Sequence, residues 1–94
     1  MFLPAAWFVY IVECADGTYY TGSTPDIHQR VAKHNLGRGA KYTKFRTPVR
    51  LIYFEKHLDK SQASQREYQI KQLTREQKEE LVMNFFTPSV PARH

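Results

Sequence analysis

Two tyrosines, an arginine and a histidine near the N-terminus are the residue types that phosphate chemistry needs. Tyr10 and Tyr20 each lie in a short aromatic segment, and Arg30 and His34 follow, one helical turn apart. A phenol can orient or deprotonate a water, and an arginine offers a planar pair of donors to phosphate oxygens. Positions 30–50 also hold seven Lys or Arg residues and no Asp or Glu. Together these features indicate phosphate chemistry on a nucleic acid.

The positive charge of the chain is concentrated in one segment. The net charge is +5, and residues 1–29 contain three acidic side chains and no Lys or Arg. A basic segment as dense as residues 30–50 attracts polyanions and displaces the counterions bound to them. We expect contacts with nucleic acid from five residues of this segment: Lys33, Arg38, Lys41, Lys44 and Arg46. The alternative interpretation is a solvated surface that keeps the protein soluble.

Length and composition predict one domain in a reducing compartment. A chain of 94 residues has room for a single modest core, so we expect one domain over residues 1–94. No apolar run approaches the roughly 18 residues that would span a bilayer, and the N-terminus lacks the positive start of a signal peptide. The lone cysteine, Cys14, cannot form an internal disulfide. We therefore expect a cytoplasmic protein without membrane contacts.

A β-hairpin is predicted near the N-terminus, with two alternative registers. Residues 7–13 and 19–22 are rich in β-branched and aromatic side chains, which favour strands. A two-residue turn would put Tyr10 and Tyr20 on opposite faces of the hairpin. A three-residue loop with Gly17 in the left-handed conformation would put them on the same face. Only the second register lets the tyrosines form one site, and propensity does not choose between the two.

A helix that follows the hairpin carries the arginine and the histidine. Thr24 is a typical N-cap, and Pro25 suits the first helical position. The helix should end near residue 35 or 36, because Gly37 is well placed as a C-terminal glycine. Arg30 and His34 border the apolar stripe of this helix, so their side chains can point toward the sheet edge.

The second half of the chain completes an α+β fold. Its predicted elements are a basic loop over residues 37–48, a strand over 49–57, a helix to about 72 capped by Asp59 or Ser61, and a helix to about 85 opened by the capping box Thr74-Arg75-Glu76-Gln77. We expect a small, mainly antiparallel three-stranded sheet flanked by about three helices. The core should cover about residues 7–82, with a frayed tail over 87–94. The site should lie on the sheet face between the first two strands and the two helices that follow.

In this order and spacing, the residues resemble the GIY-YIG nuclease domain, in its small single-domain bacterial branch (YhbQ-like). The resemblance covers about residues 7–82. Val9-Tyr10-Ile11 stands where the family has Gly-Ile-Tyr, and Tyr20-Thr21-Gly22 stands where it has Tyr-Ile-Gly. The first motif lacks its glycine, and the second has threonine in place of isoleucine. The stretch Gly39-Ala40-Lys41-Tyr42-Thr43 also resembles one typical of this branch.

The resemblance implies a metal-dependent endonuclease that hydrolyses DNA, with one divalent ion (Mg²⁺ or Mn²⁺) on Glu67. Arg30 and His34 match the arginine and the basic or histidine position of the family. We favour Tyr10 as the base, with its pKa depressed by Arg30 or the metal, and Tyr20 as the residue that orients water or phosphate. The reverse assignment is open. From spacing alone, Glu67 could instead form an ion pair with Lys71.

Several alternatives for the function remain at this stage. The chain could be a nucleic-acid-binding module with little activity, or a subunit of a larger repair complex that docks through Phe85 and Phe86. DNA repair or recombination is the expected setting, a protein partner could supply target recognition, and RNA is the alternative to DNA. The histidines lack the spacing of a zinc site, and the chain has no glycine-rich phosphate loop of the P-loop type.

Overall fold

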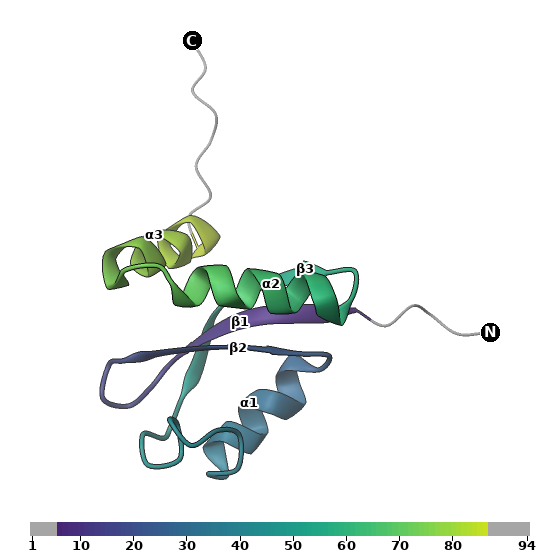
Figure 1. Cartoon of the computed structure of the whole chain (residues 1–94). Helices are drawn as coiled ribbons and strands as arrows, with labels where there is room; N and C mark the ends of the chain where they lie inside the picture. Colours follow the sequence, from purple (N-terminus) through teal and green to yellow (C-terminus); the bar gives the residue numbers. More distant parts are fainter. Residues whose placement is uncertain (1–5, 87–94) are drawn as a thin grey trace, which may run out of the picture.

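A small antiparallel sheet lies between two layers of helices (Figure 1). The computed structural model describes residues 6–86. Its elements are, in chain order, β1 (Trp7–Glu13), β2 (Tyr19–Thr24), α1 (Ile27–Asn35), β3 (Arg50–His57), α2 (Lys60–Lys71) and α3 (Arg75–Phe86). The strand order is β2-β1-β3, with both pairs antiparallel, so β2 and β3 are edge strands. The predicted α+β fold is confirmed. The tail predicted to fray, residues 87–94, lies outside the described residues.

The hairpin adopts the register that brings the two tyrosines together. The Cys14 N–H donates to the Thr18 carbonyl at 2.8 Å, and Gly17 has a φ of 85°. These are the marks of a three-residue loop with a left-handed glycine. Tyr10 and Tyr20 therefore share one face of the sheet, as the second of the two predicted registers requires.

The upper layer, α2 and α3, covers one face of the sheet (Figure 1). Val9 and Ile11 of β1 pack there against Ala63 and Ile70 of α2, and all four side chains are 0% exposed. Leu81 and Val82 of α3 pack against the same cluster. Ala63, which is small, and Ile70 lie where α2 comes closest to the sheet, and their packing positions the rest of that helix.

The lower layer consists of α1 and the basic loop. Tyr10 and Val12 of β1 point to this side, where Val31 of α1 packs against them. The helices α1 and α2 thus lie on opposite faces, and the expectation of a site on one face between them is wrong (Figure 1). The reason is that β1, buried on both faces, needs a cover on each side.

The predicted start of α1 is wrong by two residues. Asp26 is the N-cap, and its side chain accepts a hydrogen bond of 3.0 Å from the Gln29 N–H. Thr24 still belongs to β2, and its hydroxyl exchanges hydrogen bonds with the Asp26 backbone instead. The predicted end is confirmed, because the helix stops at Asn35 and Gly37 has a φ of 77°.

Two helix caps form as the sequence predicts. Asp59, rather than Ser61, caps α2 and accepts from the Gln62 N–H at 2.9 Å. Thr74 and Gln77 form a reciprocal capping box at the start of α3, with bonds of 2.9 and 3.1 Å. Within residues 6–86, none of the helices is long and apolar enough to cross a membrane.

Shortening Ile70 tests how firmly α2 is held. Ile70 is 0% exposed and lies one turn after Glu67, so its packing positions the carboxylate. We expect Ile70→Val to lower the free energy of unfolding by about 0.5–1.5 kcal/mol, through the lost methyl contacts, in urea denaturation. Tyr68→Phe, at a side chain 67% exposed on the same helix, should change it by less than about 0.5 kcal/mol. Equal effects of the two substitutions would contradict the packing described here.

Candidate active site

A chain of hydrogen bonds runs from Tyr10 through His34 into the basic loop. The Tyr10 hydroxyl lies 2.8 Å from His34 Nε2, and His34 Nδ1 lies 2.7 Å from Thr43 Oγ1. Thr43 donates to the Ala40 carbonyl at 3.2 Å, so it accepts from Nδ1. This pattern assigns the proton of neutral His34 to Nδ1 and makes Tyr10 the donor to Nε2. Tyr10, His34 and Thr43 are all 0% exposed.

Two glycines make room for these rings. Gly22 lies opposite Tyr10 in the hairpin, and a Cβ added there would come within 2.6 Å of the Tyr10 hydroxyl oxygen. A Cβ at Gly39 would fall on the His34 ring. Each glycine therefore lets the backbone approach a side chain that no other residue would admit. Both belong to stretches on which the family resemblance depends.

Burial sets the protonation states of Tyr10 and His34. Burial raises the pKa of Tyr10 to about 12, although the neighbouring Arg30 lowers it. The expectation that Arg30 would depress this pKa below its ordinary value is wrong, because desolvation has the larger effect. Burial, followed by the charge of Arg30, holds the pKa of His34 below 6.5. At neutral pH the pair is therefore a neutral phenol and a neutral imidazole.

Arg30 has an unsatisfied donor in this region. Its Nε is buried, and it has no hydrogen-bond partner among residues 6–86. A buried N–H without an acceptor costs about 1–3 kcal/mol, which an anion placed against it would recover. Because the charge of Arg30 acts on both Tyr10 and His34, the guanidinium lies beside the hydrogen-bonded pair. Arg30 thus places a positive charge next to two buried, neutral rings.

Glu67 reaches the same region from the upper layer. Its Oε1 accepts from Ser23 Oγ at 2.7 Å, and its Oε2 lies 2.8 Å from Lys71 Nζ. Ser23 follows Gly22 on the edge strand β2, so its side chain and the Glu67 carboxylate lie on the face of the sheet opposite the Tyr10 ring. The charge of Glu67 adds to the raised pKa of Tyr10. The ion pair with Lys71 that the spacing predicts is therefore present at the site itself.

The surroundings of Glu67 fit a single divalent ion completed by substrate. Within residues 6–86, no three His, Cys, Asp or Glu side chains come together as a metal-binding group. Mg²⁺ usually keeps several waters and takes one or two carboxylates together with phosphate oxygens. Glu67 Oε1, held in place by Ser23, can supply the protein ligand of such a shell. Lys71 already pairs with Oε2, so the oxygen that would hold a metal ion is Oε1, next to Ser23.

Of the two tyrosines predicted for the site, Tyr20 is the one partly open to solvent. Its ring is half-buried, with its centroid 5.2 Å from that of His34 and 6.5 Å from that of Tyr10. Tyr42 of the basic loop stacks on it at 6.1 Å, with an interplanar angle of 21°. The five predicted site residues thus gather around the edge of β2: Tyr10, Tyr20, Arg30, His34 and Glu67.

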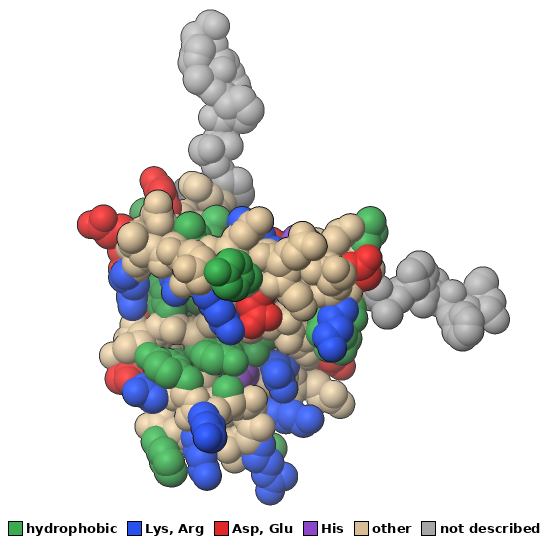
Figure 2. Space-filling view, viewed as in Figure 1, with side chains coloured by type: hydrophobic (Ala, Val, Ile, Leu, Met, Phe, Trp, Pro, Cys, Tyr) green, Lys and Arg blue, Asp and Glu red, His purple; other side chains and the backbone are tan. Residues whose placement is uncertain are grey.

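The five basic residues expected to contact nucleic acid have different environments. Lys33 lines a hollow beside Arg30. Arg46 pairs with Asp16 at 3.1 Å, donates to the Tyr42 carbonyl and lies 4.0 Å from the centroid of the Tyr42 ring. It therefore fixes the loop to the hairpin. The remaining three are exposed: Arg38, Lys41 and Lys44. Basic side chains spread over the lower half of the face in Figure 2 and meet acidic ones beneath α2.

Sequence reasoning missed the residues that hold the site together. Ser23 orients Glu67, and Thr43 orients His34. Tyr42 and Thr43 belong to the stretch that is typical of the branch, which is the sequence signal for both. The signal for Ser23 is its position immediately after the second motif, because it follows Gly22 onto the opposite face of the edge strand.

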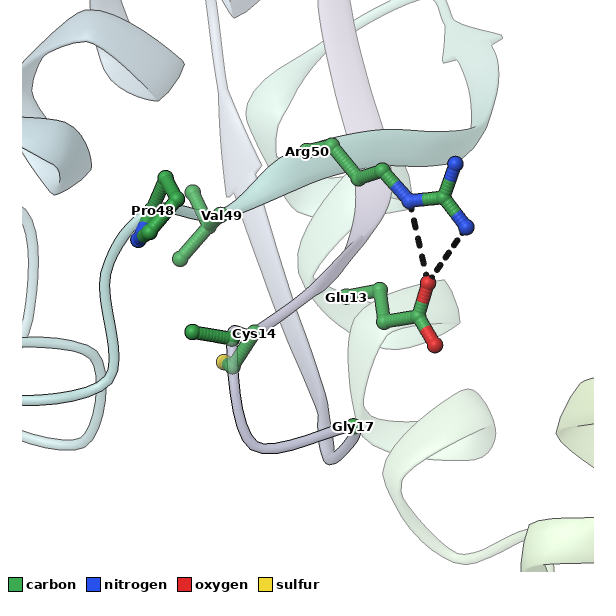
Figure 3. Close-up of a pocket in the computed structure, with 7 residues that line it drawn as sticks. Glu13, Cys14, Gly17, Pro48, Val49 and Arg50 are labelled. Carbon is green, nitrogen blue, oxygen red and sulfur yellow. Dashed lines mark hydrogen bonds and ion pairs between the residues drawn. The ribbon is translucent and has the colours of Figure 1, made fainter.

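A separate hollow, away from the five predicted site residues, lies at the turn of the hairpin (Figure 3). It measures about 330 Å³, and Arg50 closes one side with bonds of 3.0 and 2.7 Å to the Glu13 carboxylate. Burial raises the pKa of the Cys14 thiol in its wall. Its lining, within the described residues, includes none of the five predicted site residues, so size alone does not mark the site here.

The chain belongs to the GIY-YIG catalytic domain family, whose model matches residues 6–80. A UPF0213 protein of Halobacterium salinarum is 62% identical over 73 residues, which cover 78% of this chain and 95% of that protein. A UPF0213 protein of Staphylococcus epidermidis is 56% identical over 75 residues, covering 80% and 92%. The family predicted from the sequence is confirmed, and it is a family of nuclease domains.

Two solution NMR structures have a similar fold. The UPF0213 protein BH0048 from Bacillus halodurans is 44% identical, with a TM-score of 0.58 over 88% of each chain. The protein EF2693 from E. faecalis is 36% identical, with a TM-score of 0.60 over 95% of each chain. These similarities agree with the sheet and helices described above.

Protonation of His34 should make the stability depend on pH. Because its pKa in the folded protein lies below 6.5, the unfolded chain binds a proton that the folded protein does not in the interval below that value. The free energy of unfolding should therefore fall as the pH falls from about 7.5 to about 5.5, most steeply below pH 6.5. Urea denaturation across this range should show a smaller fall in His34→Gln, whose amide does not titrate.

His28→Gln is the matched control for this measurement. His28 lies on the same helix and is exposed, so its substitution should keep the pH dependence of the wild type. The explanation fails if His34→Gln and the wild type lose stability equally as the pH falls.

Proposed function

We propose that the chain is a metal-dependent endonuclease that hydrolyses phosphodiester bonds in DNA. The observation that supports it most is the convergence of Arg30 from α1, Glu67 from α2 and two tyrosines from the hairpin at the free edge of β2. Hydrolysis needs a group that binds the phosphate, an activated water and stabilisation of the leaving oxygen. These side chains have the chemistry to divide these tasks.

Arg30 is the proposed phosphate ligand. Its side chain is half-buried and lines the hollow that Ser23 and Lys33 also line, so its guanidinium is within reach of a phosphate placed there. A guanidinium presents parallel donors that match a phosphate better than a lysine ammonium does. The charge that builds up on the phosphate in the transition state would strengthen these hydrogen bonds.

Glu67 is the proposed ligand of one Mg²⁺ or Mn²⁺ ion. When bound, such an ion polarises the phosphate and stabilises the leaving oxygen. Ser23 fixes the orientation of the carboxylate through its 2.7 Å hydrogen bond to Oε1. Lys71, on the other oxygen, adds a positive charge at the edge where the DNA backbone would lie.

The burial of Tyr10 supports Tyr20 as the base. A group that takes a proton from the attacking water must be reached by that water, and Tyr10 is 0% exposed whereas Tyr20 is half-buried. The Tyr10 hydroxyl is also engaged as a hydrogen-bond donor to His34. Tyr10 and His34 then act as positioning residues, because they hold the face on which Tyr20 and Arg30 lie.

We also propose a setting for this activity. The enzyme acts in the cytoplasm on structured or branched DNA during repair or recombination, with RNA as the alternative substrate. A partner protein supplies target recognition. The end of α3 supports such a partner, because Phe86 is 63% exposed and lies beside Phe85, which packs on Tyr53 and Phe54 of β3.

A nucleic-acid-binding module without activity is the second candidate. The 2.8 Å ion pair of Lys71 with Glu67 favours it, since an internal cation already neutralises the carboxylate that would hold the metal. Such a module would bind DNA with a steep dependence on salt but would not cleave it.

Loss of the Glu67 carboxylate should abolish cleavage. We expect purified wild type to cut labelled DNA in Mg²⁺ or Mn²⁺ but not in EDTA, on at least one substrate among duplex, single strand, flap and four-way junction. Glu67→Gln, which keeps the shape but not the charge, should lose at least about 100-fold in rate, as expected for the loss of a metal ligand. Glu80→Gln, at an exposed carboxylate of α3, is the matched control.

Two outcomes would count against the nuclease. Equal cleavage by wild type and Glu67→Gln would identify a contaminating enzyme and leave the assignment of Glu67 without support. Salt-sensitive binding with no cleavage of any substrate in either metal would instead support the binding module.

The two tyrosines should differ in their effects on rate and stability. Tyr20→Phe should lower the single-turnover cleavage rate by about 100-fold or more, as expected for the loss of a general base, with little change in stability. Tyr10→Phe leaves His34 Nε2 buried without its donor, so it should cost about 1–3 kcal/mol in urea denaturation and reduce the rate less. A larger loss of rate in Tyr10→Phe than in Tyr20→Phe would instead identify Tyr10 as the base.

A further inference from the structure

The free edge of β2 is bordered by two hollows, one on each side of Gly22. The first measures about 240 Å³, and its lining includes Trp7, Ser23, Arg30 and Lys33. The second measures about 180 Å³ and is lined by Tyr19, Tyr20, Thr21, Tyr42, Lys71 and Lys78. The first hollow combines residues of β2 with side chains of β1 and α1, and the second combines residues of β2 with side chains of α2, α3 and the basic loop, so both follow the edge of the sheet.

Glu67 lies between the two hollows. One of its oxygens is bound to Ser23, in the wall of the first, and the other to Lys71, in the wall of the second. Residues 20 and 24 of β2, which belong to different hollows, are about 13 Å apart at the usual rise of a strand. A phosphate at the candidate site would therefore have one hollow on each side along the same edge.

Each hollow combines at least one aromatic ring with two cations. The first has the indole of Trp7, with Lys60 Nζ 5.5 Å from the ring centroid, together with the cations Arg30 and Lys33 and the carboxylate of Asp26. The second has the phenols of Tyr19, Tyr20 and Tyr42 together with the cations Lys71 and Lys78. Arg75 lies over the Tyr19 ring and Arg46 over the Tyr42 ring, so a base bound to either of those faces would take the place of a guanidinium. Aromatic faces beside paired cations are the features by which proteins bind unpaired nucleic acid, with bases on the rings and phosphates on the cations.

We propose that these hollows are base-binding subsites and that the substrate is an unpaired DNA strand lying along the edge of β2. The proposal rests on the nuclease function argued above and specifies its substrate class. In a duplex the bases are stacked and turned inward, so their faces could not reach the rings in the hollows. Both hollows are smaller than the roughly 300–1,000 Å³ pockets that enclose whole ligands, which suits a single base in each.

The fluorescence of Trp7 offers a direct test of the first hollow. Trp7 is the single tryptophan of the chain, so its emission reports on this hollow alone. The full chain would be titrated in EDTA, where cleavage is absent, with oligothymidylate, with a duplex of equal length and with an abasic oligonucleotide of equal charge. A base stacked on the indole quenches it, whereas phosphate contacts alone do not.

The expected result is strong quenching by oligothymidylate and little by the duplex or the abasic strand. Quenching of equal size by the abasic strand or by the duplex would overturn the proposal. The nuclease function would then still be judged separately, by the cleavage assay with Glu67→Gln. An RNA oligonucleotide in a parallel titration shows whether the ribose matters. Absence of binding by every nucleic acid would overturn the proposal, and the cleavage assay decides whether the function falls with it.

The second hollow is tested by affinity. Tyr42→Ala should weaken binding of the single strand by about tenfold, the usual effect of losing one base–aromatic contact, while Tyr42→Phe retains it. Tyr68→Ala removes an exposed tyrosine outside both hollows and should have no effect. Lys78→Ala should reduce the slope of log affinity against log salt by about 0.7, the value for one phosphate of a single strand. Equal losses of duplex and single-strand affinity in Tyr42→Ala would argue against base binding there.

Discussion

The hydrogen bond between the Tyr10 hydroxyl and His34 is the contact on which the arrangement of the site depends. It joins the central strand to α1, and Thr43 extends it to the basic loop. Because both partners are fully buried, each would be left with an unsatisfied polar atom if the other moved. A slip of β1 by one residue would turn Tyr10 into the other layer and break the bond. The register of the hairpin and the position of α1 are therefore fixed together.

The edge strand β2 shows how a small sheet can expose a strand edge and still use it. Free edges invite pairing with other chains unless charges or covers protect them. Here Glu67 and Lys71 border the edge from above, and Arg30 borders it from below. The same charges that discourage strand pairing make the edge a place for a charged ligand. Protection and access thus come from one set of side chains, drawn from helices on opposite faces.

Local patterns predicted most elements, because a cap or a turn depends on residues close in sequence. Thr74 and Gln77 form their predicted capping box, whereas the hydroxyl of Thr24 binds the turn before α1 rather than the helix. The motifs also identified the side chains that gather at the site. They could not reveal that Tyr10 is completely buried, because burial depends on α1 and the loop packing over β1. For that reason they also could not reveal that burial outweighs Arg30 and raises the pKa of Tyr10.

The basic loop, residues 37–48, is held at two points before any substrate arrives. Arg46 ties it to the hairpin through Asp16, and Thr43 ties it to α1 through His34. Ordering a free loop of this kind on binding would cost conformational entropy for each residue that becomes fixed. In this protein that cost is met during folding. The loop is preorganised, so the free energy of its contacts with a ligand goes into affinity rather than into arranging the loop.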